Sequence, residues 1–195
     1  LSNNDGCVIA RTSEAKALGF DMGAPFFKVQ RELSAKGVAV FSSNYALYAD
    51  MSSRVMAALE SLTHEVERYS IDEAFVLVPR VREADLWDLA EEIRRRVAMW
   101  TSIPVRVSIA PTKTLAKVAS ELARTQADRT WVLPSPTADA LGRVAASDVW
   151  GIGPTYQRKL AHVGVRTAWD LSRVDTAWAR KALTVAGERR GFAVD

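Results

Sequence analysis

The sequence predicts an α+β fold that gives way to an all-α region towards the C-terminus. From residue 44 onwards, the apolar pattern indicates a helix, two short strands, a second helix and a further strand. This order is typical of an antiparallel sheet with helices packed on one face. Beyond Pro134 no strand pattern survives, and short helical segments joined by glycine turns take over. We therefore expect a domain boundary near residues 127–136.

The N-terminal region is rich in turn signals, since residues 1–40 hold four of the ten glycines. A short strand over 7–10 and a helix from Ser13 are expected, followed by loops around Gly19, Gly23 and Pro25. From Asn44, a plausible N-cap, apolar residues recur at three- and four-residue steps and predict a helix. These residues are Tyr48, Met51, Val55, Leu59 and Leu62.

The next segment alternates between strand and helix signals. Short strands are expected at about 64–70 and 74–78, and a helix over 85–100 with Asp85 as its N-cap. The buried stripe predicted for that helix is Leu86, Leu89, Ile93, Val97 and Trp100.

A half-buried strand follows, because apolar and polar residues alternate over 103–109. Residues 131–133 are a candidate last strand. Before it, Pro111-Thr112 ends the strand over 103–109 and caps another helix. The apolar side of that helix is Leu115, Val118, Ala119 and Leu122.

The composition excludes several classes of protein. Of the 195 residues, 48% are apolar and 25% charged, as in a soluble globular chain. The longest apolar runs, such as 74–78, are too short to span a bilayer, and no targeting segment is expected at the start. A lone Cys7 excludes a disulfide framework, and with only His64 and His162 beside it a zinc finger is also excluded. We expect a reducing, cytoplasmic location.

The positive charge is concentrated in the C-terminal third. Residues 1–128 carry 16 Lys/Arg and 17 Asp/Glu, whereas residues 129–195 carry 10 and 6. A basic region beside a neutral one suggests a phosphate-rich partner such as nucleic acid. An ordinary solvated basic surface explains the same count.

The first motif with chemical potential is Ser70-Ile71-Asp72-Glu73, between the two short strands. On a regular strand adjacent side chains point to opposite faces, but at a hairpin bend both carboxylates can turn to one point. Two hard oxygen ligands suit Mg²⁺, and magnesium pairs align an attacking hydroxyl with a phosphate in polymerases and nucleases. The simpler interpretation is a solvated acidic turn.

The second motif is a row of cations on the helix after Pro111. Lys113, Lys117 and Arg124 share one face, opposite the apolar side, and Glu121 between them is a candidate partner for Lys117. Beside a carboxylate site, such a row would neutralise a triphosphate or a template backbone. Without that site, a solvated helix face would be the preferred explanation.

The third motif is Trp150-Gly151-Ile152-Gly153-Pro154, followed by Arg158 and Lys159. Two short helices joined by a Gly-Ile-Gly hairpin would expose backbone N–H groups at the start of the second helix, which is an anion site. This is the pattern of a helix-hairpin-helix, which grips nucleic-acid backbone without reading sequence. A plain helical turn is the alternative.

Six segments, in family order across almost the whole chain, resemble the Y-family translesion DNA polymerases and in particular their UmuC branch. The resemblance implies template-directed DNA synthesis past lesions, in DNA repair and SOS mutagenesis. The six segments are 1–11 (LSNNDGCVIAR), 14–19 (EAKALG), 41–45 (FSSNY), 69–75 (YSIDEAF), 112–117 (TKTLAK) and 148–153 (DVWGIG).

The resemblance also implies subdomains. Residues 1–9 would be the remnant of a palm strand, 10–40 the fingers, and 41–128 a ferredoxin-like palm. Residues 129–195 would form a thumb with the helix-hairpin-helix.

Roles for single residues follow from the same resemblance. Asp72 and Glu73 would bind two catalytic Mg²⁺ ions, and the segment from Ser13 to Lys16 would contact the incoming triphosphate. Many relatives have Tyr and Arg at the ends of that segment, whereas this chain has Ser13 and Lys16, a departure that the UmuC branch shares. Arg124 would also touch the triphosphate, where Lys is usual.

Family members begin with a strand that carries a first metal-binding Asp and end in a little-finger domain. This sequence starts downstream of that strand, so we expect a fragment with poor activity of its own. The implied partners are primer-template DNA, a deoxynucleoside triphosphate, a UmuD-type accessory subunit, a recombinase filament and a sliding clamp. The alternative is a truncated, non-catalytic homologue that binds DNA without sequence preference.

Overall fold

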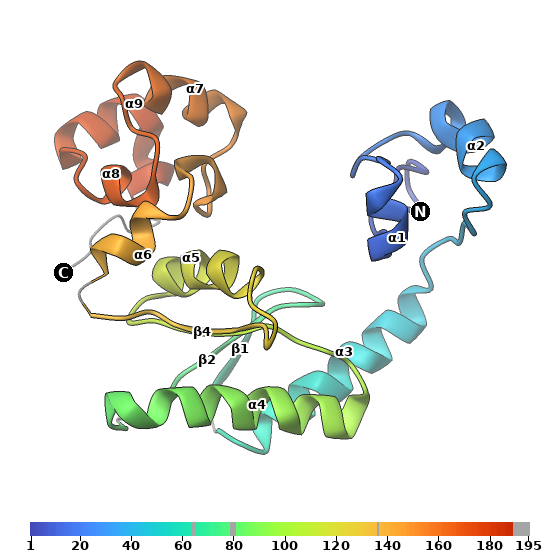
Figure 1. Cartoon of the computed structure of the whole chain (residues 1–195), viewed down its shortest axis with the longest axis horizontal. Coiled ribbons are helices and arrows are strands. Elements are labelled where there is room, and N and C mark those ends of the chain that lie inside the picture. Colours follow the sequence, from blue (N-terminus) through green and yellow to red (C-terminus); the bar gives the residue numbers. More distant parts are fainter. Residues whose placement is uncertain (64, 79–80, 136, 189–195) are drawn as a thin grey trace. The chain divides into compact units, whose positions relative to one another are not determined.

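The structure is a computed structural model that describes residues 1–63, 65–78, 81–135 and 137–188. His64 lies outside these residues. The chain divides into two compact units, residues 1–51 and 52–195, and the boundary falls inside one helix (Figure 1).

The first unit consists of short helices and turns. Helix α1 (Ser13–Ala17) starts where expected, and Thr12 Oγ1 caps it by accepting from the N–H of Ala15 at 3.3 Å. The strand expected over 7–10 is wrong, because only an isolated antiparallel bridge between Cys7 and Pro25 forms there. Helix α2 (Phe26–Ala35), which replaces an expected loop, was missed by the sequence analysis.

Helix α3 (Tyr45–Glu60) runs from the first unit into the second. The predicted N-cap is confirmed, since Asn44 Oδ1 accepts from the N–H of Leu47 at 3.1 Å. Met56, Ala58 and Leu59 are buried on its second half.

The strands of the second unit form two separate two-stranded sheets among the described residues. Strands β1 (Val66–Arg68) and β2 (Ala74–Val76) make an antiparallel hairpin. Strands β3 (Val107–Ile109) and β4 (Thr130–Val132) pair in parallel, so the expectation of an antiparallel sheet throughout is wrong. The reason is topological. The helix α5 (Lys113–Ala123) connects β3 to β4, and such a crossover returns the chain to the end of the sheet at which β3 began, so that β4 runs in the same direction.

The two long helices of this region contact both strands of the parallel pair. In Figure 1, β4 runs between α5 and α4 (Leu86–Thr101), so helices flank the pair on both sides. Thr112 caps α5 as predicted, with Oγ1 accepting from the N–H of Leu115 at 3.3 Å, and the predicted apolar side of α5 is buried.

The prediction for α4 is confirmed only in part. Ile93 and Val97 are buried against α3 and the strands, but Trp100 is 51% exposed. Asp85 is the N-cap residue of α4, as predicted, but its side chain makes no capping hydrogen bond and pairs with Arg82 at 2.8 Å instead. The short 3₁₀ turn η1 (Glu83–Asp85) precedes the helix.

Beyond β4 the chain is helical, as the sequence predicts. The elements are α6 (Ala138–Gly142), the 3₁₀ turn η2 (Ala146–Asp148), α7 (Pro154–His162), α8 (Ala168–Ser172) and α9 (Thr176–Glu188). They share one hydrophobic core with α5, in which Leu141, Leu160, Leu171 and Leu183 are fully buried. No helix in the described part of the chain is long and apolar enough to cross a membrane.

Candidate functional site: an acidic hairpin against a cationic helix

The acidic motif forms the turn between β1 and β2. The backbone N–H groups of Tyr69 and Ser70 both donate to the Glu73 carbonyl, at 3.1 and 3.0 Å, and close the turn. Asp72 and Glu73 are both exposed. A short turn of this kind presents two neighbouring carboxylates to solvent, as the sequence predicts.

The two carboxylates have different partners. Asp72 Oδ1 accepts from the Ser70 hydroxyl at 2.6 Å, so this carboxylate is held within the turn. Glu73 Oε1 accepts from Lys117 Nζ of α5 at 2.6 Å. The second contact ties the acidic turn to the next helix of the fold.

Lys117 lies among three aromatic rings. Its Nζ is 4.7 Å from the ring centroid of Tyr69, 5.6 Å from that of Phe75 and 5.8 Å from that of Trp150. The rings also meet one another, with Tyr69 edge-on to Trp150 at 5.4 Å and to Phe75 at 5.6 Å. We call these three rings the aromatic cage. It leaves the Lys117 side chain only 19% exposed.

Lys113, one turn earlier on α5, has a more open environment. It pairs with Glu67 of β1, and its Nζ lies 5.3 Å from the Phe75 ring centroid. Glu67 and Phe75 are opposite one another in the hairpin, so their side chains share one face. The side chain of Lys113 is 50% exposed.

The cationic row of α5 therefore has three different environments. Arg124 follows the last residue of the helix, is 62% exposed, and pairs with Glu121 at 3.1 Å. Glu121 was expected to pair with Lys117, but this prediction is wrong, because Lys117 pairs with Glu73 and Glu121 pairs with Arg124. A lysine can pair with an acidic residue on its own helix or with one that folding brings close from another element. Sequence spacing alone does not show which of the two pairs forms.

The residues predicted to contact a triphosphate in the first unit lie on α1. Ser13 is the first residue of this helix and Lys16 is in its last turn, and both are exposed. Asp72, Glu73 and Arg124 belong to the second unit. A shared triphosphate site remains a prediction.

The glycine hairpin of the third motif precedes α7. Gly151 has a φ of 93°, a left-handed conformation that favours glycine, and Gly153 is the N-cap residue of α7 with Pro154 at the first position. Two helices were expected to flank this hairpin. The element before it is the three-residue 3₁₀ turn η2, so one of the two flanking helices is replaced by a shorter turn.

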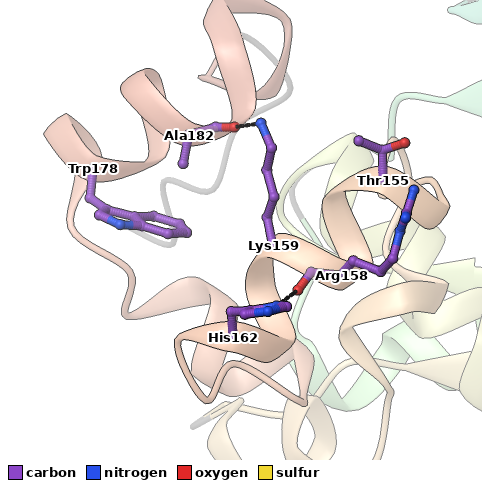
Figure 2. A pocket seen from close by; sticks show the side chains of 6 residues that line it. All are labelled: Thr155, Arg158, Lys159, His162, Trp178 and Ala182. Atoms are coloured by element: carbon purple, nitrogen blue, oxygen red, sulfur yellow. Dashed lines mark hydrogen bonds between the residues drawn. The ribbon is translucent and has the colours of Figure 1, made fainter.

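The two cations of α7 extend in different directions (Figure 2). Lys159 Nζ reaches α9 and donates to the Ala182 carbonyl at 2.7 Å, whereas Arg158 extends along α7 and is exposed. Both line an open cavity of about 610 Å³ together with Thr155, His162, Trp178 and Ala182. The spacing of Arg158 and Lys159 suggested equal roles, but their contacts differ.

The aromatic cage was missed by the sequence analysis. Tyr69 and Phe75 flank the acidic pair in the sequence, which is a weak signal. Trp150 is far from both in the sequence, and its arrival at Lys117 depends on the packing of α5 against the C-terminal helices. Local periodicity contains no information about such a contact.

The fold is that of Y-family DNA polymerases. A ternary complex of Dbh matches with a TM-score of 0.81 at 24% identity, over 97% of this chain and 57% of that chain. A Y-family DNA polymerase chimera of Dbh and Dpo4 matches with a TM-score of 0.80 at 24% identity, over 96% and 54%. At this level of identity these likenesses show the fold alone.

The sequence comparisons show the family. UmuC of Salmonella typhimurium is 47% identical over 195 residues, and DNA polymerase IV 2 of Mesorhizobium japonicum is 34% identical over 187. The matches cover 97% and 94% of this chain, but 46% and 44% of those proteins, so the chain spans about half the length of these relatives. The profile of the impB/mucB/samB family matches residues 1–121. The chain belongs to the impB/mucB/samB family.

Proposed function

We propose that the protein containing this chain is a translesion DNA polymerase that transfers nucleotides to a primer 3′ end under the direction of a template. The observation that carries the proposal is the turn that presents Asp72 and Glu73 in a chain of this family. Relatives named UmuC and DNA polymerase IV support the same activity. A role in DNA repair and SOS mutagenesis follows from the likeness to UmuC.

The donor set of the turn fits a hard divalent cation. Two carboxylates on adjacent exposed residues are the ligands that Mg²⁺ prefers. In the described part of the chain, no group of three or more His, Cys, Asp or Glu side chains could hold a metal ion. The family likeness assigns two Mg²⁺ ions to Asp72 and Glu73, with water and substrate oxygens as the further ligands. When bound, these ions would activate the primer hydroxyl and stabilise the leaving oxygen.

We propose, from the family likeness, that Ser13, Lys16 and Arg124 contact the triphosphate. Ser13 and Lys16 supply a hydroxyl and an ammonium group from α1, and Arg124 supplies a guanidinium at the end of α5. The exposure of Lys16 and Arg124 supports this role, because a phosphate can approach both. Lys113 is the better candidate for the template strand, since Lys117 is enclosed by the aromatic cage.

The C-terminal helices are the proposed DNA grip. Gly151 and Gly153 would offer backbone N–H groups to a phosphate, and Arg158 would add charge. Such contacts bind DNA without reading its sequence. Lys159 contributes to the same surface but also stabilises the docking of α9.

The remaining assignments are proposals that rest on family likeness. We assign residues 1–9, which form no strand of their own, to a remnant of the palm, 10–40 to fingers, 41–128 to a ferredoxin-like palm and 129–195 to the thumb. The partners we propose are primer-template DNA, a deoxynucleoside triphosphate, a UmuD-type subunit, a recombinase filament and a sliding clamp, in the cytoplasm.

Primer extension past a lesion tests this function. The protein as made in the cell is given a primed template with one abasic site, the four deoxynucleoside triphosphates and Mg²⁺. We expect a product ladder that passes the lesion and disappears with a chelator. DNA binding without any extension, on damaged and undamaged templates alike, would favour the non-catalytic binding module.

A further inference from the structure

Lys117 is the point at which three elements of the second unit meet. Its Nζ contacts Glu73 of the acidic turn at 2.6 Å. Tyr69 and Phe75 of the aromatic cage come from the same hairpin, but Trp150 comes from the segment that leads into α7. The ammonium group therefore connects the proposed metal site to the start of the thumb.

The surroundings of Lys117 are unlike those of an ordinary surface cation. An ammonium group is attracted to the faces of aromatic rings, and the attraction grows when water is excluded. Three ring centroids lie within 5.8 Å of Nζ, and the side chain is 19% exposed. A cation so enclosed has few alternative positions, and this enclosure favours its contact with Glu73.

We propose that Lys117 is an internal counter-ion that holds Glu73 and competes with the divalent metal ion for it. This inference rests on the proposed function, because it assumes that Glu73 is a metal ligand. Lys117 is thus a positioning residue. It fixes the carboxylate by binding Oε1, and its positive charge opposes a second cation on the same group.

Removing the ammonium group of Lys117 should have two opposite effects, one on metal affinity and one on the rate of extension. Without the ammonium group, the acidic turn carries one more uncompensated negative charge, so a divalent cation binds more tightly. Without the contact to Oε1, Glu73 gains rotational freedom and is less well placed for the reaction. Lys117 would therefore weaken the binding of free metal while raising the maximal rate of extension.

A matched control is available one helical turn away. Lys113 lies on the same helix, carries the same charge and also approaches Phe75, but its carboxylate partner is Glu67. Replacing Lys113 by Met therefore removes one positive charge from the neighbourhood without releasing Glu73. Any difference between the two variants reports the contact with Glu73.

The direct test measures Mn²⁺ binding without DNA or nucleotide. Electron paramagnetic resonance of free Mn²⁺ gives the dissociation constant for the full chain and for Lys117→Met, Lys113→Met and Asp72→Ala. We expect Lys117→Met to bind about threefold to tenfold more tightly than wild type, and Lys113→Met to change the constant by less than about twofold. Unchanged or weaker binding by Lys117→Met would overturn the inference.

The same titration separates this inference from the proposed function. Asp72→Ala should lose the Mn²⁺ site, and full retention of binding in that variant would refute the metal assignment itself. If Asp72→Ala loses binding while Lys117→Met equals wild type, the site stands and the counter-ion role falls.

Two further variants guard against a purely structural explanation. Lys117→Arg keeps the charge and should bind Mn²⁺ as wild type does. Trp150→Leu opens the aromatic cage with both charges retained and should shift Mn²⁺ binding in the direction of Lys117→Met, but less.

In primer extension, Lys117→Met should need less Mg²⁺ for half-maximal rate and reach a lower maximum. A simple loss of structure would instead raise the Mg²⁺ requirement.

Discussion

The acidic hairpin and the α7–α9 surface both have lysine and arginine near a turn, but they use these charges differently. At the hairpin, Lys117 is enclosed by rings and paired with Glu73. At α7, Arg158 is exposed and Lys159 binds a main-chain carbonyl of α9. The first arrangement fixes the position of one carboxylate, whereas the second leaves charge available for a diffuse partner such as a phosphate backbone.

This difference predicts in which of the two regions a single substitution impairs function most. A fixed charge pair controls geometry, so small changes there should have large effects on a reaction. An open basic surface contributes to binding roughly in proportion to its charge, so single changes should have modest effects.

The largest effect is expected at the acidic turn. In the protein as made in the cell, Asp72→Ala or Glu73→Ala should lower primer extension by about a thousandfold or more, because alignment and charge stabilisation are both lost. DNA affinity should hardly change. Single-turnover extension measures the first effect and fluorescence anisotropy the second.

Glu67→Ala is the matched control, since it removes a carboxylate of the same hairpin that pairs with Lys113. Its extension rate should stay within about tenfold of wild type. Equal losses in the two kinds of variant would indicate a general charge effect of the hairpin.

The next effect concerns the core that holds the thumb helices to α5. Leu160 is fully buried among residues of α5, α8 and α9. Leu160→Ala should lower the free energy of unfolding by about 2–5 kcal/mol, because a cavity forms where the side chain was. Urea denaturation measures this loss. A similar cost for Leu77→Ala, a 60% exposed residue, would contradict the assignment of the core.

A smaller effect is expected at the α7 surface. Arg158→Ala should weaken DNA binding about equally for all sequences and reduce the slope of log affinity against log salt by about one unit. Lys159→Ala should change this slope less and should lower thermal stability, because its ammonium group stabilises the docking of α9. Titrations at several salt concentrations distinguish the two, and an unchanged slope in both variants would exclude the proposed grip.

Much of the local structure could be predicted, because its signals are local. The apolar side of α5 and the caps at Asn44 and Thr112 depend on neighbours within one helical turn, and the structure confirms them. Trp100 continued the predicted helical stripe but is exposed, because the buried row of α4 runs from Val97 to Thr101 instead. The parallel pairing of β3 and β4 depends on topology, which periodicity does not encode.

The same distinction applies to the candidate site. Asp72 and Glu73 are neighbours in sequence, and the bend that exposes them was evident from the flanking strands. The partner of Glu73 was not predicted, because Lys117 reaches it only once α5 has packed beside the hairpin. Trp150 approaches from a third element, so its contribution required the whole of the second unit.

The smallest effect is a pH dependence at the start of α8. Asp170 forms a capping box with Thr167, and hydrogen bonds from the backbone N–H groups of Arg166 and Thr167 hold the pKa of Asp170 below its usual range. A lowered carboxyl pKa adds stability that is present above the unfolded-state pKa and is lost as the pH falls through the folded-state pKa. Asp170→Asn should therefore lower the melting temperature at neutral pH, and the difference should shrink on acidification. A difference that stays constant down to pH values below the carboxyl range would contradict this role.

The central claim is that a divalent ion binds at the acidic turn beside Lys117. Fe²⁺ can take the place of Mg²⁺ at such oxygen sites, and with peroxide and ascorbate it cleaves the nearby backbone. Mapping the cuts by mass spectrometry therefore tests the claim most directly. We expect cuts within residues 69–75 and on α5 near Lys117, their loss on addition of excess Mg²⁺, and their absence in Asp72→Ala. Cuts only elsewhere in the chain, or cuts at the turn that persist in Asp72→Ala, would contradict the account.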